Sequence, residues 1–356
     1  MIPDYISHLR KMIATPSLSR DEAATADIWE NWLIEKNAGN VERLHNNIFV
    51  FASGFDTSKP ILMLNSHHDT VKPASSYTRD PFSPDIEGDR LYGLGSNDAG
   101  ASGVALAMAF LALKDDDTLP VNLLLAITAA EEVMGELGMR AFLPYLREIG
   151  RYPDMVLVGE PTGMQPAIAE RGLLVLDCVA KGRAGHAARN EGINALYRAM
   201  EDIGSLRNFH PAKTSEILGP IKVNVTMIQC GTQHNVVPDT CTYVADIRTT
   251  DAYSNEETVE LLRKCVKWSE ITPRSTRVHA SVIESEHPLV EASVALGKTP
   301  FISPTTSDMA LMHDIPSLKM GPGESARSHS ADEFIRISEI EDAIQTYINL
   351  IRSLKI

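Results

Sequence analysis

The stretch VNLLLAITAAEE, residues 121–132, ends an apolar run with two adjacent carboxylates. A nearly continuous apolar run of this length is typical of a sheet strand that is covered on both faces. Two buried carboxylates at its end carry a large desolvation cost unless a cation or hydrogen bonds stabilise them. Because neighbouring side chains of an extended chain point to opposite sides, Glu131 and Glu132 are expected to have different partners.

Other segments repeat this arrangement and define the fold class. PILMLNSHHD (residues 60–69) and PDMVLVGEPT (residues 153–162) predict buried strands that end in polar residues. NNIFVFAS (residues 46–53) predicts another strand, and ASGVALAMAFLAL (residues 101–113) predicts a buried helix. This alternation over the first 170 or so residues predicts an α/β sheet layered with helices.

The N-terminal segment is expected to form two helices. Apolar residues recur at helical spacing over residues 5–13, which predicts the first helix. Ser19 is followed three residues later by Glu22, a spacing typical of a capping box. We therefore predict that Ser19 caps a second helix that continues to Leu33.

The pattern changes after Gly172 and returns to α/β texture from His287. Alternating segments predict strands at residues 173–182, 221–231, 240–250 and 276–285, with amphipathic helices at 193–206 and 255–270. The order β-α-β-β-α-β is that of a ferredoxin-like unit. We therefore predict a main domain formed by residues 1–171 and 287–356, and an inserted α+β domain formed by residues 172–286.

Composition limits the possible partners. The chain has 356 residues and a formal net charge of -14, which argues against a nucleic acid or an anionic membrane surface. Its four cysteines are widely spaced without a C-x-x-C pair, and this favours reduced core thiols over a disulfide framework or a thiolate zinc site. No apolar segment approaches the ~18 residues of a membrane span, and the N-terminus lacks an apolar signal region. We expect a cytoplasmic protein that has no membrane partner.

The polar residues at the strand ends suggest a metal site. Ligands in open α/β sheets bind at the carboxyl ends of strands, and chemistry-bearing side chains gather there in this sequence. These residues are His67, His68, Asp69, Asp98, Glu131, Glu132, Glu160 and His329. So many carboxylates in one place would repel one another strongly, and bound cations would relieve that repulsion.

The types of ligand indicate which metal is expected. Imidazoles and carboxylates without thiolates suit Zn²⁺, or its neighbours Co²⁺ and Mn²⁺, better than calcium. His67 and Asp69 lie two residues apart on a strand and therefore share one face. Asp69 can orient the His67 imidazole, whereas His68 points away and is expected to be a bystander.

A set of motifs, in this order, resembles the co-catalytic zinc aminoacylases and carboxypeptidases, a family that includes acetylornithine deacetylase and succinyl-diaminopimelate desuccinylase. The motifs are HHDTV (67–71), RDPFSPDIEGDRLYGLGSNDAG (79–100), TAAEE (128–132), VGEPT (158–162), GHAARNEGINA (185–195), NVVPDTCTYVADIR (235–248) and HSADEF (329–334). The resemblance covers nearly the whole chain and is greatest to acetylornithine deacetylases. It implies a zinc-exopeptidase-like α/β/α catalytic domain with an inserted ferredoxin-like lid, through which two chains would form a homodimer.

The resemblance also implies roles for the residues at the strand ends. Asp98 would bridge two zinc ions, for which Co²⁺ or Mn²⁺ could substitute, and the bond between Asp98 and Ala99 would be cis. The protein ligands would be completed by His67 and Glu160 at one ion, and by Glu132 and His329 at the other. Glu131 would be the general base, and Asp69 would hold His67.

In the inserted domain the resemblance implies residues that contact the substrate. His186 would help to stabilise the oxyanion, and Asn235 and Arg248 would contact the substrate, Arg248 through its α-carboxylate. Two structural alternatives stay open, since His186 could cap a turn and Arg248 could pair with Asp246. Gly323, with the neighbouring glycine and proline, and the stretch Thr306–Asp308 are expected to form pocket loops.

The expected activity is hydrolysis of the amide bond of an N-acyl amino acid. N-acetylornithine, or another N-acyl-ornithine or N-acyl-citrulline, is favoured as a substrate in arginine biosynthesis. A succinyl-diaminopimelate desuccinylase and a dipeptidase or aminopeptidase of the same family are the alternatives. The sequence departs from the family pattern after Asp69, after Asp98 and after His186, so Lys72 or Arg189 could lie near the pocket and favour an acidic acyl group.

Two other classes of protein fit the sequence less well. YGLGSNDAG (residues 92–100) partly resembles a dinucleotide-binding glycine motif, but Asp98 stands where the third glycine is needed. A metal-free binding protein on the same fold is disfavoured because Glu131 and the full set of ligands are present. Metal analysis of the purified protein distinguishes both classes from a metallohydrolase.

Overall fold

The apolar part of the VNLLLAITAAEE stretch forms a central strand of the sheet. In a computed structural model, which describes residues 2–189 and 191–356, residues Asn122–Thr128 form strand β6. Every residue of this strand is buried. Leu123, Leu125 and Ile127 join one hydrophobic cluster, and Leu124 and Ala126 join another on the opposite side. The expectation of a strand covered on both faces is therefore confirmed.

The chain divides into two compact units. The first contains the residues up to Ile168 together with Ile283–Phe301 and Ser307–Ile356. The second contains Ala169–Val282 and Ile302–Thr306. The sequence predicted an insert over residues 172–286, which differs from the second unit by a few residues at each end. The segment Ile302–Thr306 was predicted to belong to the main domain but groups with the second unit.

The first unit is built on a mixed sheet. Its strands follow the order β1-β2-β6-β3-β7-β17-β8. The central strands β6, β3, β7 and β17 are all parallel to one another. The strands are β1 (Val41–Leu44), β2 (Asn47–Phe51), β3 (Ile61–His67), β7 (Met155–Val158), β17 (Ser317–Lys319) and β8 (Ala167–Glu170). A small antiparallel sheet, β18-β5-β4, is formed by Phe334–Arg336, Arg90–Tyr92 and Ile86–Glu87.

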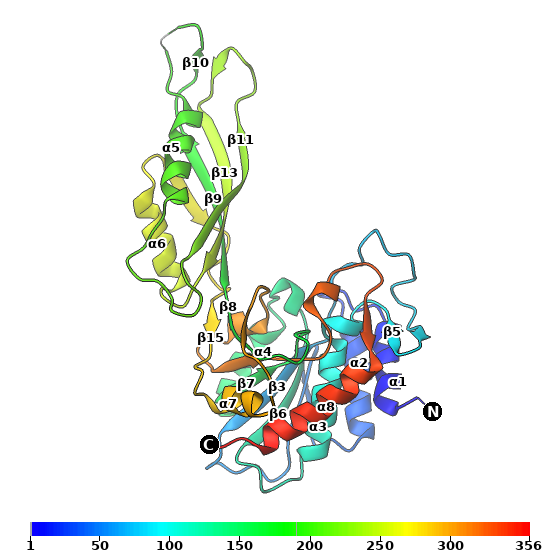
Figure 1. The fold of residues 1–356 in the computed structure, drawn as a ribbon. Coiled ribbons are helices and arrows are strands. Elements are labelled where there is room, and N and C mark those ends of the chain that lie inside the picture. Colours follow the sequence, from blue (N-terminus) through cyan, green and yellow to red (C-terminus); the bar gives the residue numbers. More distant parts are fainter. Residues whose placement is uncertain (1, 190) are drawn as a thin grey trace. The chain divides into compact units, whose positions relative to one another are not determined.

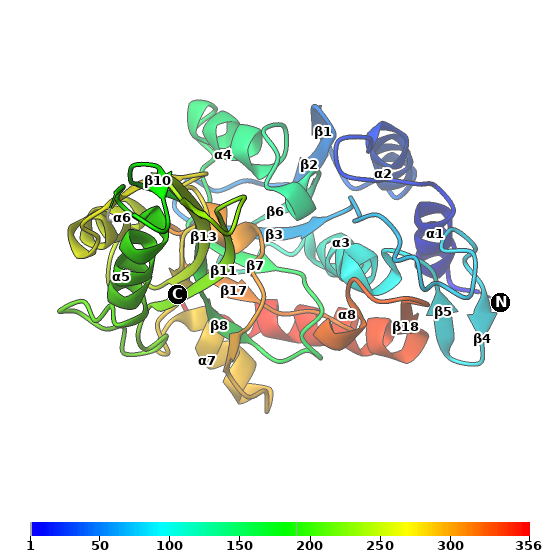
Figure 2. The same cartoon turned by 90° about the horizontal axis from the view of Figure 1, so that it is seen from above.

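Helices cover both faces of this sheet (Figure 2). One face packs against α1 (Asp4–Ile13), α2 (Ala23–Glu35), α3 (Ala101–Leu113), α7 (Pro288–Ala295) and α8 (Ile337–Arg352). The other face packs against α4 (Met139–Glu148) and a short turn, Asp308–Leu311. The predicted α/β/α layering is therefore confirmed.

The second unit has the predicted ferredoxin-like topology. Its antiparallel sheet has the order β11-β13-β9-β14, and α5 and α6 pack against it (Figure 1). The elements are β9 (Gly172–Lys181), α5 (Ala195–Arg207), β11 (Lys222–Cys230), β13 (Thr240–Thr249), α6 (Asn255–Cys265) and β14 (Ser269–Pro273). A short pair, β10 (Gly185–His186) and β12 (Val236–Val237), completes it. The chain passes between the units within β8, at the end of β15 (Ser281–Val282), within β16 (Phe301–Ser303), and again between Thr306 and Ser307.

Two local predictions were wrong. Ser19 does not cap α2, which begins at Ala23 without a side-chain cap, and the Ser19 hydroxyl donates to Asp69 instead. The last strand of the ferredoxin-like sheet, β14, lies at Ser269–Pro273, inside and beyond the end of a predicted helix. Of the strand predicted at residues 276–285, Ser281–Val282 forms β15, which pairs with β8 and not with that sheet. Pairing with β9 outweighs helix periodicity at β14, because the strand completes an otherwise open sheet edge.

Within the described residues, one helical segment, Ser96–Leu113, is long and apolar enough to meet the length and composition of a membrane span. It is 72% buried inside the protein, as is usual for a core helix, and it includes the predicted helix at residues 101–113. The four cysteines, all within the described residues, are free thiols.

Candidate active site

The parallel strands bring the predicted residues to one edge of the sheet. His67 is the last residue of β3 and lies in register with Thr128, the last residue of β6. Val158 ends the neighbouring strand β7, two residues before Glu160. The turns that carry Glu131, Glu132 and Glu160 therefore start beside His67, because the carboxyl ends of parallel strands share an edge.

His67 is held in one orientation. Its side chain is 1% exposed, and its Nδ1 lies 2.9 Å from the backbone oxygen of Asp69 and 3.5 Å from the Asp69 carboxylate. An Nδ1–H that donates to these oxygens leaves Nε2 as the free lone pair. This Nε2 lies 3.3 Å from Asp98 Oδ1, 3.6 Å from Glu160 Oε1 and 4.0 Å from Glu131 Oε2.

Asp98 faces a different histidine with each of its carboxylate oxygens. Oδ1 faces His67 Nε2, and Oδ2 lies 3.5 Å from His329 Nε2. His329 Nε2 also lies 3.0 Å from Glu132 Oε2. The peptide bond between Asp98 and Ala99 is cis, as the resemblance implied. One carboxylate between two imidazoles is the geometry of a bridging ligand.

The structure thus gathers two overlapping groups of potential ligands. His67, Asp98 and Glu160 form one, and Asp98, Glu132 and His329 form the other, with the ligand atoms of each group within 4.8 Å of one another. These are the two groups that the family resemblance implied. His67, Glu131 and Glu132 form a further overlapping group.

Glu131 and Glu132 occupy a tight turn, Glu131–Val133, and not an extended strand end. Ala130 before it has a positive φ of 57°, which turns the chain sharply. Glu132 faces His329, and Glu131 faces His67 from a buried position. The two glutamates therefore have different partners, as expected, and it is the turn that separates them.

The electrostatics of this cluster fit bound cations. Burial and then the negative charge of Asp98 raise the pKa of Glu160 to about 8. Burial, with Glu160 and Asp308 nearby, holds the pKa of Glu131 well above its ordinary value. Several buried carboxylates that destabilise one another in this way are stabilised by divalent cations, and the imidazole and carboxylate donors suit a zinc-like metal.

Asp69 stabilises more than the imidazole. Its carboxylate accepts hydrogen bonds from the backbone N–H groups of Glu131 (3.0 Å) and Glu132 (3.3 Å), and from the hydroxyl of Ser19 (2.7 Å). Asp69 therefore connects His67 to the turn of the two glutamates. Ser19 could not be identified as a site residue from the sequence, because its spacing to Glu22 suggested a helix cap.

Glu333 was also missed. It is buried, and its carboxylate accepts backbone N–H groups from the turn that carries Asp98. Its position four residues after His329 in HSADEF was the only signal available in the sequence.

Of the three residues predicted to contact the substrate from the inserted unit, His186 and Asn235 lie side by side. His186 of β10 pairs with Val236, next to Asn235, and the backbone oxygen of Asn235 accepts the Ala187 N–H at 3.0 Å. His186 Nδ1 accepts the N–H of Ala188 at 3.1 Å, which is the turn cap that the sequence left open. With Nδ1 as the acceptor, the ring N–H lies on Nε2, which has no hydrogen-bond partner among the described residues.

Arg248 makes the other contact that was left open. Its Nε lies 2.8 Å from Asp246 Oδ1 and its terminal nitrogen 3.1 Å from Oδ2. This bidentate pair leaves further guanidinium N–H groups for a second carboxylate.

Gly323 occupies a crowded position. It has a φ of 81°, and a Cβ there would lie 2.2 Å from the Asn97 side-chain oxygen. Its backbone oxygen accepts the N–H of Gly163, close in sequence to Glu160. The glycine therefore lets the loop after β17 pass between Asn97 and the Glu160 loop.

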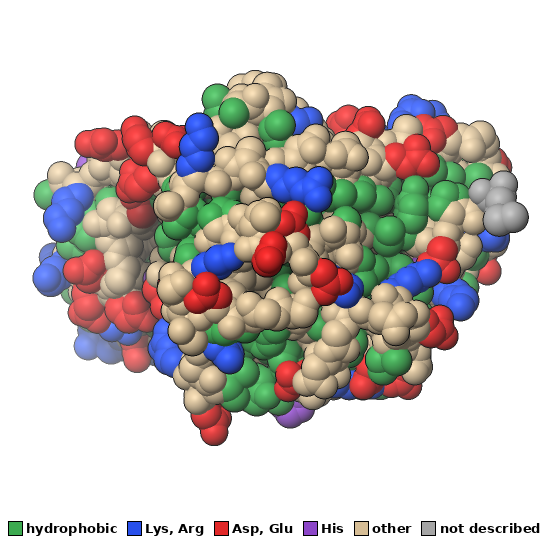
Figure 3. Space-filling view, turned by 90° about the horizontal axis from the view of Figure 1, so that it is seen from below, with side chains coloured by type: hydrophobic (Ala, Val, Ile, Leu, Met, Phe, Trp, Pro, Cys, Tyr) green, Lys and Arg blue, Asp and Glu red, His purple; other side chains and the backbone are tan. Residues whose placement is uncertain are grey.

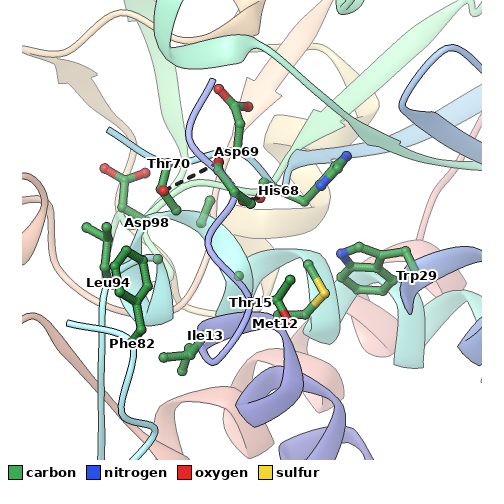
Figure 4. A pocket seen from close by; sticks show the side chains of 14 residues that line it. Met12, Ile13, Thr15, Trp29, His68, Asp69, Thr70, Phe82, Leu94 and Asp98 are labelled. Carbon is green, nitrogen blue, oxygen red and sulfur yellow. Dashed lines mark hydrogen bonds between the residues drawn. The ribbon is translucent and has the colours of Figure 1, made fainter. Parts of the chain in front are cut away.

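A small cavity lies beside the cluster, between α1 and the residues around Asp69 and Asp98 (Figure 4). Apolar side chains including Met12, Ile13 and Phe82 line its other wall. Its volume of about 20 Å³ accommodates a single water molecule and not an amino-acid derivative.

Solved structures share this fold over the whole chain. The M20 family metallo-carboxypeptidase Sso-CP2 from Sulfolobus solfataricus matches with a TM-score of 0.74 at 18% identity, covering 99% of each chain. The Bacillus subtilis YXEP protein, described as a dinuclear metal binding peptidase from the M20 family, matches with a TM-score of 0.72 at 17% identity, covering 98% of this chain and 96% of that one.

Sequence comparison identifies the family. The family described as peptidase family M20/M25/M40 matches residues 63–353, and the chain belongs to it. Succinyl-diaminopimelate desuccinylase of Rhizorhabdus wittichii is 29% identical over 318 residues, covering 83% of this chain and 81% of that protein. Acetylornithine deacetylase of Proteus mirabilis is 28% identical over 375 residues, covering 96% and 94%. The protein is thus a metal-dependent amidohydrolase of this family.

Proposed function

We propose that the protein hydrolyses the amide bond of an N-acyl amino acid with the help of two zinc ions. The observation that carries this proposal is the position of Asp98, whose two carboxylate oxygens face His67 and His329. Glu160 completes the ligands on the His67 side and Glu132 those on the His329 side.

Two bound divalent cations supply an activated water and a Lewis acid for the scissile carbonyl. The protein supplies the groups that hold and move protons. Glu131 is buried beside the ligands, where it accepts the proton of the attacking water and returns it to the departing amine. Asp69 keeps the His67 imidazole and the Glu131 turn in fixed relation.

The inserted unit supplies contacts to the substrate in this proposal. The Nε2–H of His186 is a donor for the developing oxyanion, and Asn235 is beside it through the β10–β12 pair. Arg248, already oriented by Asp246, binds the α-carboxylate. The family resemblance supports these three roles, and Lys72 and Arg189 are exposed residues that could contact the acyl group.

The favoured substrate is N-acetylornithine, or another N-acyl-ornithine or N-acyl-citrulline, in arginine biosynthesis. Acetylornithine deacetylases match nearly the full chain, as the 96% coverage by the Proteus mirabilis enzyme illustrates. The second candidate is succinyl-diaminopimelate, which the relative at 29% identity supports. A dipeptide is the third, because solved peptidases share the fold.

A panel of substrates tests this proposal. The zinc- or cobalt-reconstituted protein is incubated with N-acetyl and N-succinyl forms of ornithine and citrulline, with succinyl-diaminopimelate and with dipeptides, and the free amino acid is measured by chromatography. We expect kcat/KM for an ornithine or citrulline derivative to exceed that of the other classes by about tenfold, a difference of 1.4 kcal/mol in transition-state stabilisation. A preference for succinyl-diaminopimelate or dipeptides would contradict the substrate proposal.

We also propose a homodimer formed through the second unit. β11 is an edge strand of that unit, and it exposes Met227 (65%) and Ile228 (52%). Tyr197 and Met200 on α5 are exposed as well. Unpaired strand edges with apolar side chains are common sites of chain association.

The remaining expectations concern location and other partners. We propose a cytoplasmic protein, which its free thiols support. On the face drawn in Figure 3, basic and acidic side chains are interspersed, and this distribution supports a small-molecule substrate over a nucleic acid.

A further inference from the structure

Glu333 is a buried carboxylate that the proposed reaction does not use. It lies just before β18, and its own backbone oxygen accepts the N–H of Gly93. The residue is 2% exposed, although no lysine or arginine is recorded in contact with its carboxylate among the described residues. A carboxylate in such a position needs several hydrogen-bond donors.

The donors come from the backbone of the turn that carries Asp98. Glu333 Oε1 accepts the N–H groups of Asn97 (2.8 Å) and Asp98 (2.9 Å), and Oε2 accepts the N–H of Gly95 (3.1 Å). Three backbone donors on one buried carboxyl group fix the turn in position, because each N–H is paired with an oxygen of the segment that carries His329.

Asn97 makes a second connection between the same two segments. Its side-chain nitrogen donates to the backbone oxygen of Glu324 (3.1 Å) and to the Ser328 hydroxyl (3.3 Å), and its oxygen accepts the Glu324 N–H (3.0 Å). The turn of Asp98 is therefore bound to residues on both sides of His329.

The two groups of ligands differ in how well they are enclosed. The side chain of His67 is 1% exposed, whereas that of His329 is 55% exposed and belongs to an irregular loop. Glu132 comes from a separate turn after β6. The distance between Asp98 and His329 is thus set by the contacts of Glu333 and Asn97, together with the pairing of β18 with β5, and not by the main sheet.

We propose that Glu333 is a positioning residue for the metal pair: by fixing the Asp98 turn to the segment that carries His329, it determines how tightly the cation at Asp98, Glu132 and His329 is held. The inference rests on the proposed function for the presence of that cation. It concerns a residue that touches neither the cation nor the substrate.

Glu333→Gln is the informative substitution. It keeps the size of the side chain, but the amide nitrogen would face an N–H group of the turn, so one donor loses its acceptor. Loss of such a supporting residue typically lowers metal affinity by about 10–100-fold. We expect the second equivalent of Co²⁺ to bind about 10–100-fold more weakly and the first equivalent to change by less than about threefold.

Asp332→Asn is the matched control. Asp332 is the neighbouring residue, and its carboxylate also accepts backbone N–H groups, those of Thr78 (2.9 Å) and Arg79 (3.1 Å). It anchors the same segment without touching the Asp98 turn. The control is expected to bind both equivalents of Co²⁺ with wild-type affinity.

The experiment titrates the metal-free full-length protein with Co²⁺ and follows bound metal and the visible absorption of Co²⁺, which depends on ligand geometry. Thermal unfolding of the metal-free proteins is recorded in parallel. Wild-type affinity for both equivalents in Glu333→Gln would overturn the inference, even if that variant unfolds at a lower temperature, because its role would then be structural only.

Two further outcomes have a defined meaning: a variant that does not fold, and a wild-type protein that binds too little metal. If Glu333→Gln is not recovered folded, Glu333→Asp decides, since it keeps the carboxyl group but is too short to reach all three donors; wild-type binding in that variant would overturn the inference. A wild-type protein that binds fewer than two equivalents would contradict the proposed function itself, whatever the variants do.

Discussion

Glu131 and Glu132 show how adjacent residues of one type acquire different roles. The turn that begins after Ala130 directs Glu132 to His329 and keeps Glu131 buried near His67. Asp69 holds the backbone N–H groups of both residues. The separation of a ligand from a base therefore depends on backbone geometry as well as on residue type.

Removal of the base tests this division. Glu131→Gln is expected to lower kcat by about 10²–10⁴-fold, the usual contribution of general acid–base catalysis, while two metal ions per chain are retained. Steady-state kinetics and metal analysis of the same sample measure both quantities. Glu136→Gln is the control, because Glu136 follows in the same loop with an 82% exposed side chain. Near-normal turnover in Glu131→Gln would show that another group is the base.

His8 provides a test of stability at low pH. It is buried against Trp29 and Trp32 with no hydrogen-bond partner for either ring nitrogen among the described residues, and burial lowers its pKa to about 3. The unfolded chain binds a proton at His8 near pH 6.5, and the folded protein does so only near pH 3. Stability is therefore lost as pH falls from 6.5 towards 3, by at most about 1.4 kcal/mol per pH unit from this residue.

Urea unfolding at several pH values measures this effect. His8→Phe keeps a stacked ring that does not titrate. As the pH falls from 6.5, the wild type is therefore expected to lose more unfolding free energy than the variant. Parallel pH profiles for the two proteins would contradict the proposed burial of neutral His8.

At the scale of elements, the segment between α1 and α2 supports the site. Ser19 donates to Asp69, and its backbone N–H bonds to the oxygen of Thr70 at 3.2 Å. Ser19→Ala is expected to lower the unfolding free energy of the metal-free protein by about 1–3 kcal/mol, because a buried carboxylate loses a donor. Ser7→Ala is the control, since among the described residues that hydroxyl bonds only to the backbone oxygen of Pro3, directly before α1; an equal effect of both substitutions would argue against a specific role for Ser19.

The sequence predicted the elements that pattern alone defines. Continuous apolar runs identified β3, β6 and β7, and the residues after them led to His67, Glu131 and Glu160 because parallel strands end together. β14 was misplaced because its residues continue the periodicity of α6. Strand pairing between distant segments, here with β9, is not encoded in local spacing.

The supporting residues of the site could not be predicted for a related reason. Ser19 and Glu333 act through hydrogen bonds to residues 50 and about 235 positions away in the chain. Ser19 also carries a misleading local signal, its spacing to Glu22. Motif resemblance found the ligands, but only the three-dimensional arrangement shows which residues hold them.

At the scale of the whole molecule, association through the second unit can be tested directly. Met227→Asp combined with Ile228→Asp places two charges on the exposed edge strand β11 and is expected to convert a dimer to a monomer. Sedimentation velocity measures the change. Val294→Asp, at an exposed apolar residue of α7 in the first unit, is the control and should leave the dimer intact. A monomeric wild-type protein would contradict the proposed dimer.

The central claim is that one carboxylate, Asp98, joins two groups of ligands into a dinuclear centre. Metal content of the purified protein, measured after reconstitution with zinc or cobalt and removal of excess metal, tests this claim most directly. The account predicts two ions per chain for the wild type and a loss of bound metal in Asp98→Ala. Fewer than two bound ions per chain in the wild type would contradict it.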